Sequence, residues 1–325
     1  MRLRKKLACA VASVLLSATG TGVLAAYPDK PVTIVVPYAP GGATDSTARI
    51  LAQALQARAG KSFIVDNAPG GGTTIGAAKV TRAPADGYTF LFGGLSANVL
   101  APQLYSEVIS FDPETAFESV AQVASQPLIL VVNSESPYKS LDDLLTAARA
   151  KPGQINFGSP GAGSAPHLIS ELFLMEAGIE AQHIPFRGAA PSLTALIGGE
   201  IDLFMDTPTA PMPHVEGGKL RALGVTSKEP VAELNGIPTI HEQGVKDFEA
   251  YTWYALYAPK GTPPDILDQV NAWVNEALND EQVRQQMARV YLHPASGTRD
   301  DLDQYTRQER SRWTQIIKTK NLQSE

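Results

Sequence analysis

The chain has 325 residues, of which 44% are hydrophobic and 18% are charged. This is the composition of an ordinary globular protein, and the length leaves room for two domains with separate cores. The formal net charge is −6, and residues 1–26 carry four basic and no acidic residues, so without them it would be −10. Such acidity disfavours nucleic acid or an anionic membrane surface as a partner, and an anionic ligand would need a local binding device.

The N-terminal segment has the pattern of a secretory signal peptide. Basic residues lie within 1–6, an apolar run follows at 7–16, and small residues lead up to Ala26. The apolar run is too short to span about 30 Å of hydrocarbon, which disfavours a membrane anchor. We therefore expect residues 1–26 to be removed by cleavage after Ala26 or Ala25, and the mature protein to reside in the periplasm.

The single cysteine, Cys9, lies within this N-terminal segment. It precedes the apolar run and has Lys6 three positions before it, which is not the pattern of a lipoprotein cysteine. The remainder of the chain has no thiol for a disulfide, a nucleophile or a thiolate metal site. An exported chain without cysteine fits the bacterial periplasm, and we expect neither a metal nor a cofactor.

Beyond residue 26, strand-like and helix-like patterns alternate along the chain. The expected strands are 32–36, 63–65, 89–92, 128–132, 155–157, 183–186, 201–204, 220–225 and 253–258. The expected helices are 46–59, 73–82, 141–150, 165–177, 190–198, 266–278, 280–288 and 299–319. Strands separated by helices of about ten or more residues predict an α/β fold of βαβ units, with mostly parallel sheets flanked by helices.

No repeat, low-complexity tract or Gly/Ser linker divides this pattern. We expect instead two domains joined by strands that cross twice, near 122–132 and 251–260, because both segments are extended and apolar. The first domain would then be discontinuous, formed by 27–125 and 255–325, and the second would comprise 126–254.

The stretch from Pro40 to Asp45 joins a strand to a helix through two glycines. Gly41 and Gly42 can adopt positive φ and permit close backbone approach, and Asp45 or Ser46 can cap the helix that follows. A helix N-terminus presents unpaired N–H groups and attracts anions. The alternative is a loop that only turns the chain.

Residues 158–168 read GSPGAGSAPHL and repeat this arrangement after another strand. Ser164 is the expected N-cap of the next helix, and Ser159 adds a second hydroxyl group. Two more glycine-rich stretches, 67–72 and 93–96, also follow strands, which is where ligands bind in open α/β sheets. Together these loops predict an anion-binding cleft between the two domains.

Several further side chains are candidate ligand contacts, and each has a structural alternative. Arg187 could clamp a carboxylate or lie in a surface salt bridge. Asp206 could bind a water or a hydroxyl group of the ligand, or cap the next turn. Tyr38, Phe92 and Phe157 end strands and could line the cleft, although aromatic residues at such positions usually belong to the core.

Motifs of common enzyme classes are missing from the sequence. No two histidines have the spacing of a zinc-binding His-x-x-x-His pair, and no serine has the flanking glycines of a nucleophile elbow. His167 could pair with Ser164 across one helical turn, but a structural hydrogen bond is the simpler interpretation. We therefore expect a binding protein rather than an enzyme.

Six ordered segments, spread over the chain beyond residue 26, resemble one family. They read YPDKPVTIVVPYAPGGATD, NAPGGGTTIGAAKVTRAPADGYTFLFG, INFGSPGAGSAPHL, GEIDLFMD, GKLRALGVTS and WYALYAPKGTP. The set resembles the Bug (Bordetella uptake gene) family, the periplasmic receptors of tripartite tricarboxylate transporters. The resemblance implies a two-domain, Venus-flytrap fold, type II-like, which performs no chemistry and grips a carboxylate through backbone amides and ordered waters.

The resemblance also implies a set of ligand-binding residues and partners. The residues of the first domain are Tyr38, Ala39, Gly41, Gly42, Thr44 and Asp45, with Gly71 and Ser96 nearby. Those of the second domain are Ser159, Gly161, Gly163 and Ser164, with Arg187, Gly188 and Asp206 also facing the cleft. Tyr38 stands where the family often has phenylalanine. The implied partners are a small carboxylate and the membrane components of the transporter, and the receptor itself is expected to be a monomer.

Two other functions stay open from the sequence. One is a periplasmic enzyme acting on a carboxylate, with Ser164 or Asp206 catalytic. The other is a ligand sensor whose closure is passed to a membrane kinase. The ligand is equally open, because dicarboxylic, citrate-like, amino-acid, nicotinate and aromatic acids are all compatible. The aromatic strand ends favour an aromatic or otherwise planar acid.

Overall fold

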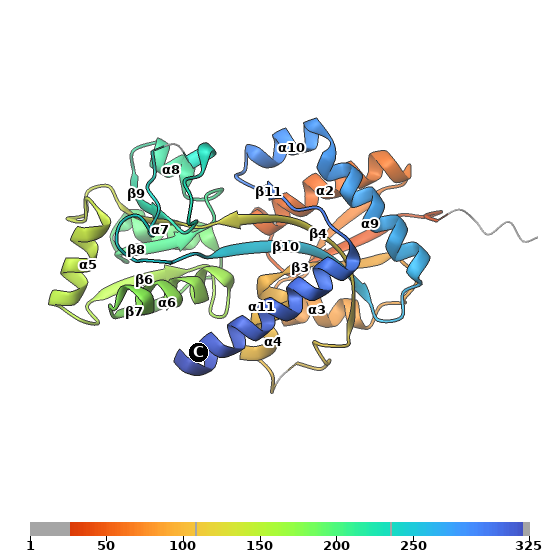
Figure 1. Cartoon of the computed structure of the whole chain (residues 1–325), viewed down its shortest axis with the longest axis horizontal. Coiled ribbons are helices and arrows are strands. Elements are labelled where there is room, and N and C mark those ends of the chain that lie inside the picture. Colours follow the sequence, from red (N-terminus) through yellow and green to blue (C-terminus); the bar gives the residue numbers. More distant parts are fainter. Residues whose placement is uncertain (1–26, 108, 235, 321–325) are drawn as a thin grey trace, which may run out of the picture.

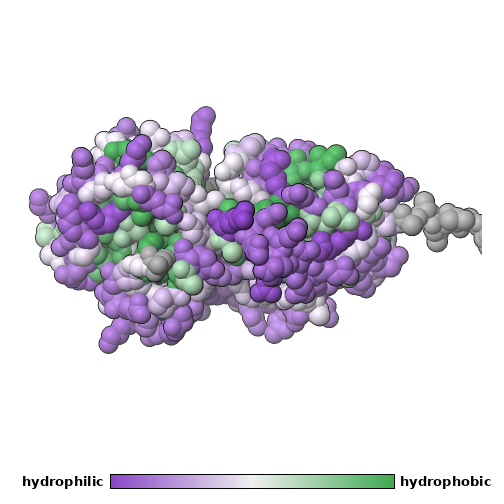
Figure 2. Space-filling model, turned by 90° about the horizontal axis from the view of Figure 1, so that it is seen from above, coloured by the Kyte–Doolittle hydropathy of each residue, from purple (hydrophilic) through white to green (hydrophobic). Residues whose placement is uncertain are grey.

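Two separate sheets organise the chain into two lobes (Figure 1). The computed structural model describes residues 27–320 except 108 and 235, so the expected signal peptide lies outside the described residues. We call the part built on the six-stranded sheet the first lobe and the part built on the five-stranded sheet the second lobe. Seen from above, the lobes are separated by a waist (Figure 2).

The sheet of the first lobe has the strand order β11-β4-β10-β3-β1-β2. Its strands are β1 (Val32–Val36), β2 (Phe63–Asn67), β3 (Thr89–Gly94), β4 (Phe117–Pro127), β10 (Tyr251–Pro259) and β11 (His293–Pro294). The strands β2, β1 and β3 pair in parallel, whereas β10 is antiparallel to both β3 and β4.

The sheet of the second lobe has the strand order β7-β6-β8-β5-β9. Its strands are β5 (Ile129–Asn133), β6 (Ile155–Ser159), β7 (Ala181–Pro185), β8 (Leu203–Asp206) and β9 (Leu220–Val225). Here β7, β6 and β8 pair in parallel, and β5 runs antiparallel to β8 and β9.

Both sheets are therefore mixed, and the prediction of mostly parallel sheets is wrong in this respect. The parallel part of each sheet comes from βαβ units, as predicted. The antiparallel part comes from the strands at the crossing between the lobes. The chain leaves the first sheet along β4 and returns to it along β10, so these two strands run in opposite directions. The two-domain α/β architecture itself is confirmed, while the predicted boundaries at 125/126 and 254/255 stay a prediction.

Helices cover the faces of both sheets (Figure 1). Those of the first lobe are α2 (Ala43–Ala59), α3 (Thr74–Thr81), α4 (Ala101–Leu104), α9 (Pro264–Asn279), α10 (Glu281–Ala288) and α11 (Arg299–Lys320), with the short turns η1 (Gly71–Thr73) and η2 (Leu95–Leu100). Those of the second lobe are α5 (Leu141–Ala150), α6 (Ala165–Ala177), α7 (Ala189–Gly198), α8 (Met212–Glu216) and the turn η3 (Ala232–Leu234). Of these, α4, α8 and the turns were not expected from the sequence.

The long helix α11 starts on the first lobe and reaches the second (Figure 1). Its Trp313 is buried, and the Trp313 indole donates a hydrogen bond to Glu309, which also accepts one from Trp253 of β10. Arg312 donates to the backbone carbonyl of Glu249, just before β10. The C-terminal helix thus packs against the crossing strands of the first lobe.

Within the described ranges, none of the helices combines the length and the apolarity that crossing a bilayer requires.

Candidate ligand-binding site

Glycine-rich turns from both lobes meet at the carboxyl ends of parallel strands. The turn after β3 begins with Gly94, whose φ is 140° and at which a Cβ atom would lie 2.0 Å from the carbonyl oxygen of Trp253. Only glycine permits this approach. The chain then forms a π-helical turn over η2, a rare geometry that is frequent at functional sites. This turn carries Ser96 toward the second lobe.

The first loop, residues 37–45, is held by a charged side chain. The Asp45 carboxylate accepts hydrogen bonds from the Gly41 N–H at 2.9 Å, from Arg49 Nε at 3.0 Å and from Asn67 Nδ2 at 3.0 Å. Burial opposes ionisation of Asp45, but the bonds from Arg49, Gly41 and Asn67 outweigh it and lower its pKa. Asn67 also donates to the carbonyl of Tyr38, which ties the loop to the end of β2.

The helix after this loop begins earlier than the sequence indicated. Its N-cap is Gly42, with no side-chain cap, and its first residue is Ala43. The expectation that Asp45 or Ser46 caps the helix is wrong, because Asp45 lies one turn inside and reaches back to Gly41 instead. The helix N-terminus still presents N–H groups without intrahelical partners beside Gly42, as the anion hypothesis requires.

The second loop, residues 158–165, is held by neutral side chains. Ser164 caps α6 as predicted, accepting from the His167 N–H and donating to the carbonyl of Gly161. The Gly163 N–H donates to His167 Nδ1 at 3.1 Å. The Ser159 hydroxyl is fully buried, accepts from the Gly161 N–H and lies 2.7 Å from His183 Nε2.

The two histidines behind the second loop stack on one another. Their ring centroids are 3.8 Å apart at an interplanar angle of 17°, and Phe157 stacks against both rings. Burial lowers the pKa of His183 to about 4, and burial together with the neighbouring His183 lowers the pKa of His167 to about 3. Both rings are therefore neutral at physiological pH. A neutral Nδ1 is what lets His167 accept the Gly163 N–H.

The lobes touch through these loops. The first N–H of α6, on Ala165, donates to Ser96 Oγ of the first lobe at 3.0 Å. The Tyr105 hydroxyl, also in the first lobe, donates to the carbonyl of Ala162 at 3.2 Å. The Tyr105 ring lies against Gly163 on one side and Gly72 on the other, where a Cβ atom at either glycine would contact it. The second loop thus contacts the first lobe at Ser96 of η2 and at Tyr105.

A small cavity lies at this contact. It measures about 20 Å³ and is lined by Tyr38, Thr44, residues 93–97 and residues 252–254. This is the space of about one water molecule, and all of the lining residues belong to the first lobe. Tyr38, Thr44 and Ser96, three of the predicted ligand contacts, lie here together.

The crossing strands close one end of the site. Tyr254 of β10 stacks on Phe92 and donates from its hydroxyl to Gln126 of β4 at 3.3 Å. Burial raises the pKa of Tyr38 to about 12, against the opposing effect of Ser96, and the charge of Asp206 adds to the rise. Burial likewise raises the pKa of Tyr254, with contributions from Asp206 and Tyr38. Tyr38, Tyr254 and Asp206 therefore form one cluster, drawn from both lobes and a crossing strand.

The η1 turn beside Tyr105 is strained. Thr73 has φ of 88°, although a β-branched residue rarely adopts positive φ, and its buried hydroxyl has no hydrogen-bond partner among the described residues. Gly71, a predicted ligand contact, lies in this turn and accepts from the Thr74 hydroxyl. Strain and an unsatisfied hydroxyl are found at functional sites.

The remaining predicted residues lie around this centre. Ala39 and Gly41 are exposed in the first loop, and the Asp45 oxygens are bound within the first lobe. The Gly188 N–H donates to the carbonyl of Pro160, so the 186–188 turn lies on the second loop. Arg187 in that turn is exposed and has neither a hydrogen bond nor an ion pair among the described residues. Ligand contact by any of these residues stays a prediction.

Sequence reasoning missed several residues of the site. They are Tyr105, His183, Thr252, Trp253 and Tyr254. His183 and Tyr254 lie on strands that were predicted from the hydrophobic pattern. That pattern indicates which residues are buried, but it does not indicate the hydrogen-bond partners of their polar atoms. Phe92 and Phe157, offered as cleft residues, are fully buried core residues.

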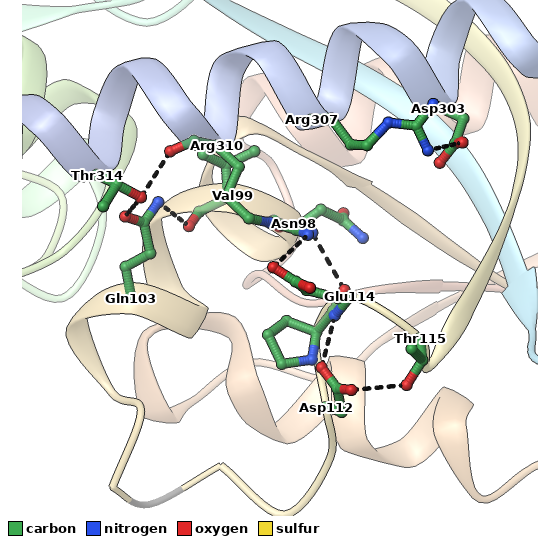
Figure 3. A network of polar contacts seen from close by, with 11 residues as sticks. Asn98, Val99, Gln103, Asp112, Glu114, Thr115, Asp303, Arg307, Arg310 and Thr314 are labelled. Carbon is green, nitrogen blue, oxygen red and sulfur yellow. Dashed lines mark hydrogen bonds and ion pairs between the residues drawn. The ribbon is translucent and has the colours of Figure 1, made fainter.

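A larger cavity, of about 400 Å³, lies elsewhere, between α11 and the segment before β4. Figure 3 shows the network at its wall, where Arg310 donates to the carbonyls of Asn98 and Pro113 and pairs with Glu114. Thr314 and Gln103 extend the network to the carbonyl of Val99. None of the predicted site residues lines this cavity. Its polar contacts anchor η2, and therefore Ser96, to α11.

Comparison with known proteins agrees with this architecture. Residues 47–322 match the family of tripartite tricarboxylate transporter receptors. The chain belongs to this family. Protein BugT of Bordetella pertussis is 34% identical over 292 residues, which cover 90% of this chain and 90% of BugT. The resemblance to Bug receptors is thereby confirmed.

Solved structures of relatives share the fold over nearly the whole chain. A protein of R. palustris, solved with adipate, is 34% identical, covers 91% of this receptor and 99% of its own chain, and gives a TM-score of 0.87. The periplasmic binding protein BugD is 30% identical, covers 92% of this receptor and 100% of its own chain, and gives a TM-score of 0.84. The expected periplasmic-binding-protein architecture is confirmed by this similarity.

Among the described residues of the receptor, no cluster of three or more His, Cys, Asp or Glu side chains could hold a metal ion.

Proposed function

We propose that this receptor resides in the periplasm, captures a small carboxylate between its lobes and delivers it to the membrane components of a tripartite tricarboxylate transporter. The observation that carries the proposal is the contact between Ser96 Oγ and the Ala165 N–H, because it brings the glycine-rich turn after β3 of the first lobe to the N-terminus of α6 in the second. A carboxylate that replaces Ser96 as the acceptor there would receive the Ala165 N–H and lie at the favourable end of the helix dipole.

The chemistry of the site supports an anion held without a basic side chain. Charge-assisted hydrogen bonds contribute about 1.5–3 kcal/mol each, so four or five of them can leave the roughly 8 kcal/mol of micromolar affinity after binding costs. The relative from R. palustris was solved with adipate, a dicarboxylate. Arg187 lies beside Gly188, which is bonded to Pro160 of the second loop, so it is placed to add a charged donor once the lobes close on a ligand.

Capture requires the lobes to open and close. The cavity of about 20 Å³ is lined by first-lobe residues alone, so a ligand held by both lobes lies between them, and we infer that it enters an open form and then bridges them. Bridging stabilises the closed form only if the ligand contacts both lobes there and one lobe in the open form. Small-angle scattering measures this: a tightly bound ligand should make the protein more compact than a ligand-free open form, and no change would contradict closure.

The polar groups of the second loop argue for capture rather than chemistry. The Ser164 hydroxyl is engaged with Gly161 and His167 as a helix cap, and His167 uses Nδ1 to accept the Gly163 N–H. Neither is arranged as a nucleophile with its base. The Ser159 hydroxyl does lie 2.7 Å from His183 Nε2, but it is fully buried, so a substrate does not reach it in this arrangement. The enzyme hypothesis is tested by incubating the pure protein with a bound acid and recovering it: unchanged acid supports a receptor, and a product supports an enzyme.

A thermal-shift screen of carboxylates tests the proposal directly. A ligand of the native state at about 100 times its Kd adds about 2.7 kcal/mol of stability and raises the melting temperature. At least one acid should do so, whereas neutral sugars and amines should not. The opposite pattern would refute an anion receptor.

A pair of glycine variants places the binding event at the second loop. Gly163 and Gly153 have similar positive φ values, 74° and 71°, but a Cβ atom meets Leu104 and Tyr105 only at Gly163. Gly163→Ala should abolish the ligand-induced shift, while Gly153→Ala should lower stability by a similar amount and keep the shift. Equal ligand response in both variants would place binding elsewhere.

A further inference from the structure

Asp206 is a buried carboxylate with one oxygen unused. It ends β8, opposite Ile129 at the start of β5, and is 5% exposed. Its Oδ1 accepts from the Thr207 N–H at 2.7 Å and faces the Thr207 hydroxyl at 3.4 Å. Its Oδ2 has no hydrogen-bond partner among the described residues, and none of their basic side chains forms an ion pair with Asp206. Oδ2 is not one of the described polar atoms that are both fully buried and unpaired, so it keeps access to solvent and a donor of the ligand can take the place of water there.

The surroundings connect Asp206 to the small cavity, although Asp206 is not one of the residues that line it. Three residues further on, Thr209 Oγ1 accepts from Gln126 Nε2 at 3.1 Å, and Gln126 in turn accepts from the Tyr254 hydroxyl. Tyr254 and Tyr38 both line the cavity. The ionisable groups that face Asp206 are these two tyrosines, and both stay neutral at physiological pH because burial raises the pKa of each phenol.

The Asp206 carboxylate would repel an anionic ligand group. An anion site beside it is therefore consistent only with a ligand that carries a carboxylate at one end and a hydrogen-bond donor at the other. The helix N-terminus of α6 and the first loop suit a carboxylate. A second carboxylate placed against Asp206 would meet a like charge in a poorly solvated site. A hydroxyl or ammonium group at that end would instead donate to Oδ2 and satisfy it.

We propose that Asp206 Oδ2 accepts a hydrogen bond from a hydroxyl or ammonium group of the ligand. The receptor then selects carboxylates that carry such a donor, namely hydroxy acids and amino acids, over the same acids without it. This inference rests on the proposed carboxylate-binding function and adds the class of ligand. A buried acceptor left unpaired by the wrong ligand is a strong means of discrimination.

The proposal predicts how selectivity changes with pH. Burial raises the pKa of Asp206 to about 7, against the opposing bonds from Thr207. Well above that value the group is an acceptor only, so a donor on the ligand is required. Below that pH the protonated Asp206 side chain can itself donate a hydrogen bond to a ligand oxygen. Acids without a hydroxyl or ammonium group should then bind more tightly, and their affinity should approach that of the donor-bearing acids.

Titration calorimetry with matched acids tests the inference. The probes are succinate, malate and aspartate, and the five-carbon series glutarate, 2-hydroxyglutarate and glutamate, at about pH 8, where the free oxygen is ionised. In at least one series the wild-type protein should bind the hydroxy or amino acid about tenfold or more tightly than the plain acid. At about pH 5.5 the ratio of these two affinities should fall severalfold.

Two variants assign the selectivity to Asp206. Asp206→Asn keeps the shape and offers a donor, so the ratio should fall to about threefold or less while plain acids bind as well as before or better. Asp202→Asn is the matched control, because Asp202 lies at the other end of the same strand and binds the Asn156 N–H; its ratio should equal that of the wild type. Circular dichroism establishes that both variants are folded.

The outcomes separate this inference from the proposed function. If wild-type protein binds plain and donor-bearing acids equally at about pH 8, the inference is wrong and the carboxylate receptor stands. If no acid of either kind binds to folded wild-type protein while other solutes do, the proposed function fails. Should Asp206→Asn not fold, the wild-type ratio and its pH dependence still decide the matter.

Discussion

The two glycine-rich loops of this receptor, residues 37–45 and 158–165, have the same design and are held in opposite ways. Each follows a strand, turns through glycines and ends at a helix N-terminus. The first loop is fastened by an ionised carboxylate, Asp45, bound to Arg49 and Asn67. The second is fastened by the neutral, stacked rings of His167 and His183. The same kind of loop can therefore be held in place either by an ionised side chain or by neutral ones.

The difference has a physical consequence for the two lobes. An ion pair with a half-exposed arginine is weakened by salt and resists moderate acid. A buried pair of neutral histidines is indifferent to salt, but protonation in the unfolded chain opposes it as the pH falls. The two halves of one binding site should thus respond to different changes of condition.

The largest predicted effect is on the pH dependence of stability. The folded pKa values of His167 and His183, about 3 and about 4, lie below the ordinary value of 6.5. The unfolded chain binds these protons first, so their contribution is present above pH 6.5 and is lost as pH falls toward 4. Between pH 7 and pH 5 the loss is about 4 kcal/mol for both rings.

Asp206 opposes this loss, because its folded pKa, about 7, lies above the ordinary value of 3.8. The folded protein takes up that proton first, so protonation of Asp206 increases the free energy of unfolding by about 2 kcal/mol between pH 7 and pH 5. Urea unfolding should show wild-type stability falling by about 1–2 kcal/mol from pH 7 to pH 5, and Asp206→Asn falling by about 4 kcal/mol. Identical pH profiles for the two proteins would contradict this assignment.

The next effect concerns the second loop alone. His167→Ala removes the acceptor of the Gly163 N–H and the ring that packs on His183, so the free energy of unfolding should drop by about 2–3 kcal/mol at neutral pH. The control is His214→Ala, a partly exposed histidine of α8, for which the change should stay within about 0.5 kcal/mol. Similar losses in both variants would show that the stacked pair does not support the loop.

A smaller effect is expected for the first loop. Asp45→Asn keeps the shape and removes the charge, so stability should fall by about 1–2 kcal/mol at low ionic strength and by less in about 1 M salt. Asp66→Asn breaks the exposed ion pair with Lys79 and should cost about 0.5 kcal/mol or less. A loss for Asp45→Asn that is independent of salt would mean that hydrogen-bond geometry, not charge, holds the loop.

The smallest effect concerns the contact between the loops. Ser96→Ala removes the acceptor of the Ala165 N–H and should lower stability by about 1 kcal/mol or less. Its distinctive readout is small-angle scattering, in which the ligand-free variant should be more extended than the wild type. Ser170→Ala removes a hydroxyl bonded within α6 and should leave the scattering unchanged. A variant as compact as the wild type would show that Ser96 does not hold the lobes together.

Local pattern was sufficient for much of the fold. The alternation of apolar strands and amphipathic helices predicted most elements, and Ser164 was recognised as a cap because its position before an apolar helix has one simple explanation. The start of α2 was missed because Gly42, which has no side chain to mark a cap, occupies that position. The π-helical turn at Ser96 depends on the approach of Trp253, which lies far along the chain.

Some residues of the candidate site could be recognised from the sequence, and others could not. Its glycines and serines were recognisable because positive φ and helix capping are properties of a residue and its neighbours. The roles of Tyr105, His183 and Tyr254 were not recognisable, because each depends on a partner more than twenty residues away in the sequence. The same holds for Asp206, whose importance lies in the groups that surround its free oxygen.

The sequence by itself thus determined the α/β class, the positions of the glycine-rich loops and the family resemblance, because these depend on local propensity and on ordered motifs. Only the tertiary structure decided that both sheets are mixed, that a charge holds one loop and neutral histidines hold the other, and that Asp206 is buried at the end of β8. The physical reason is that burial and long-range pairing set the protonation state and partner of a polar group, and neither is encoded in the residues beside it.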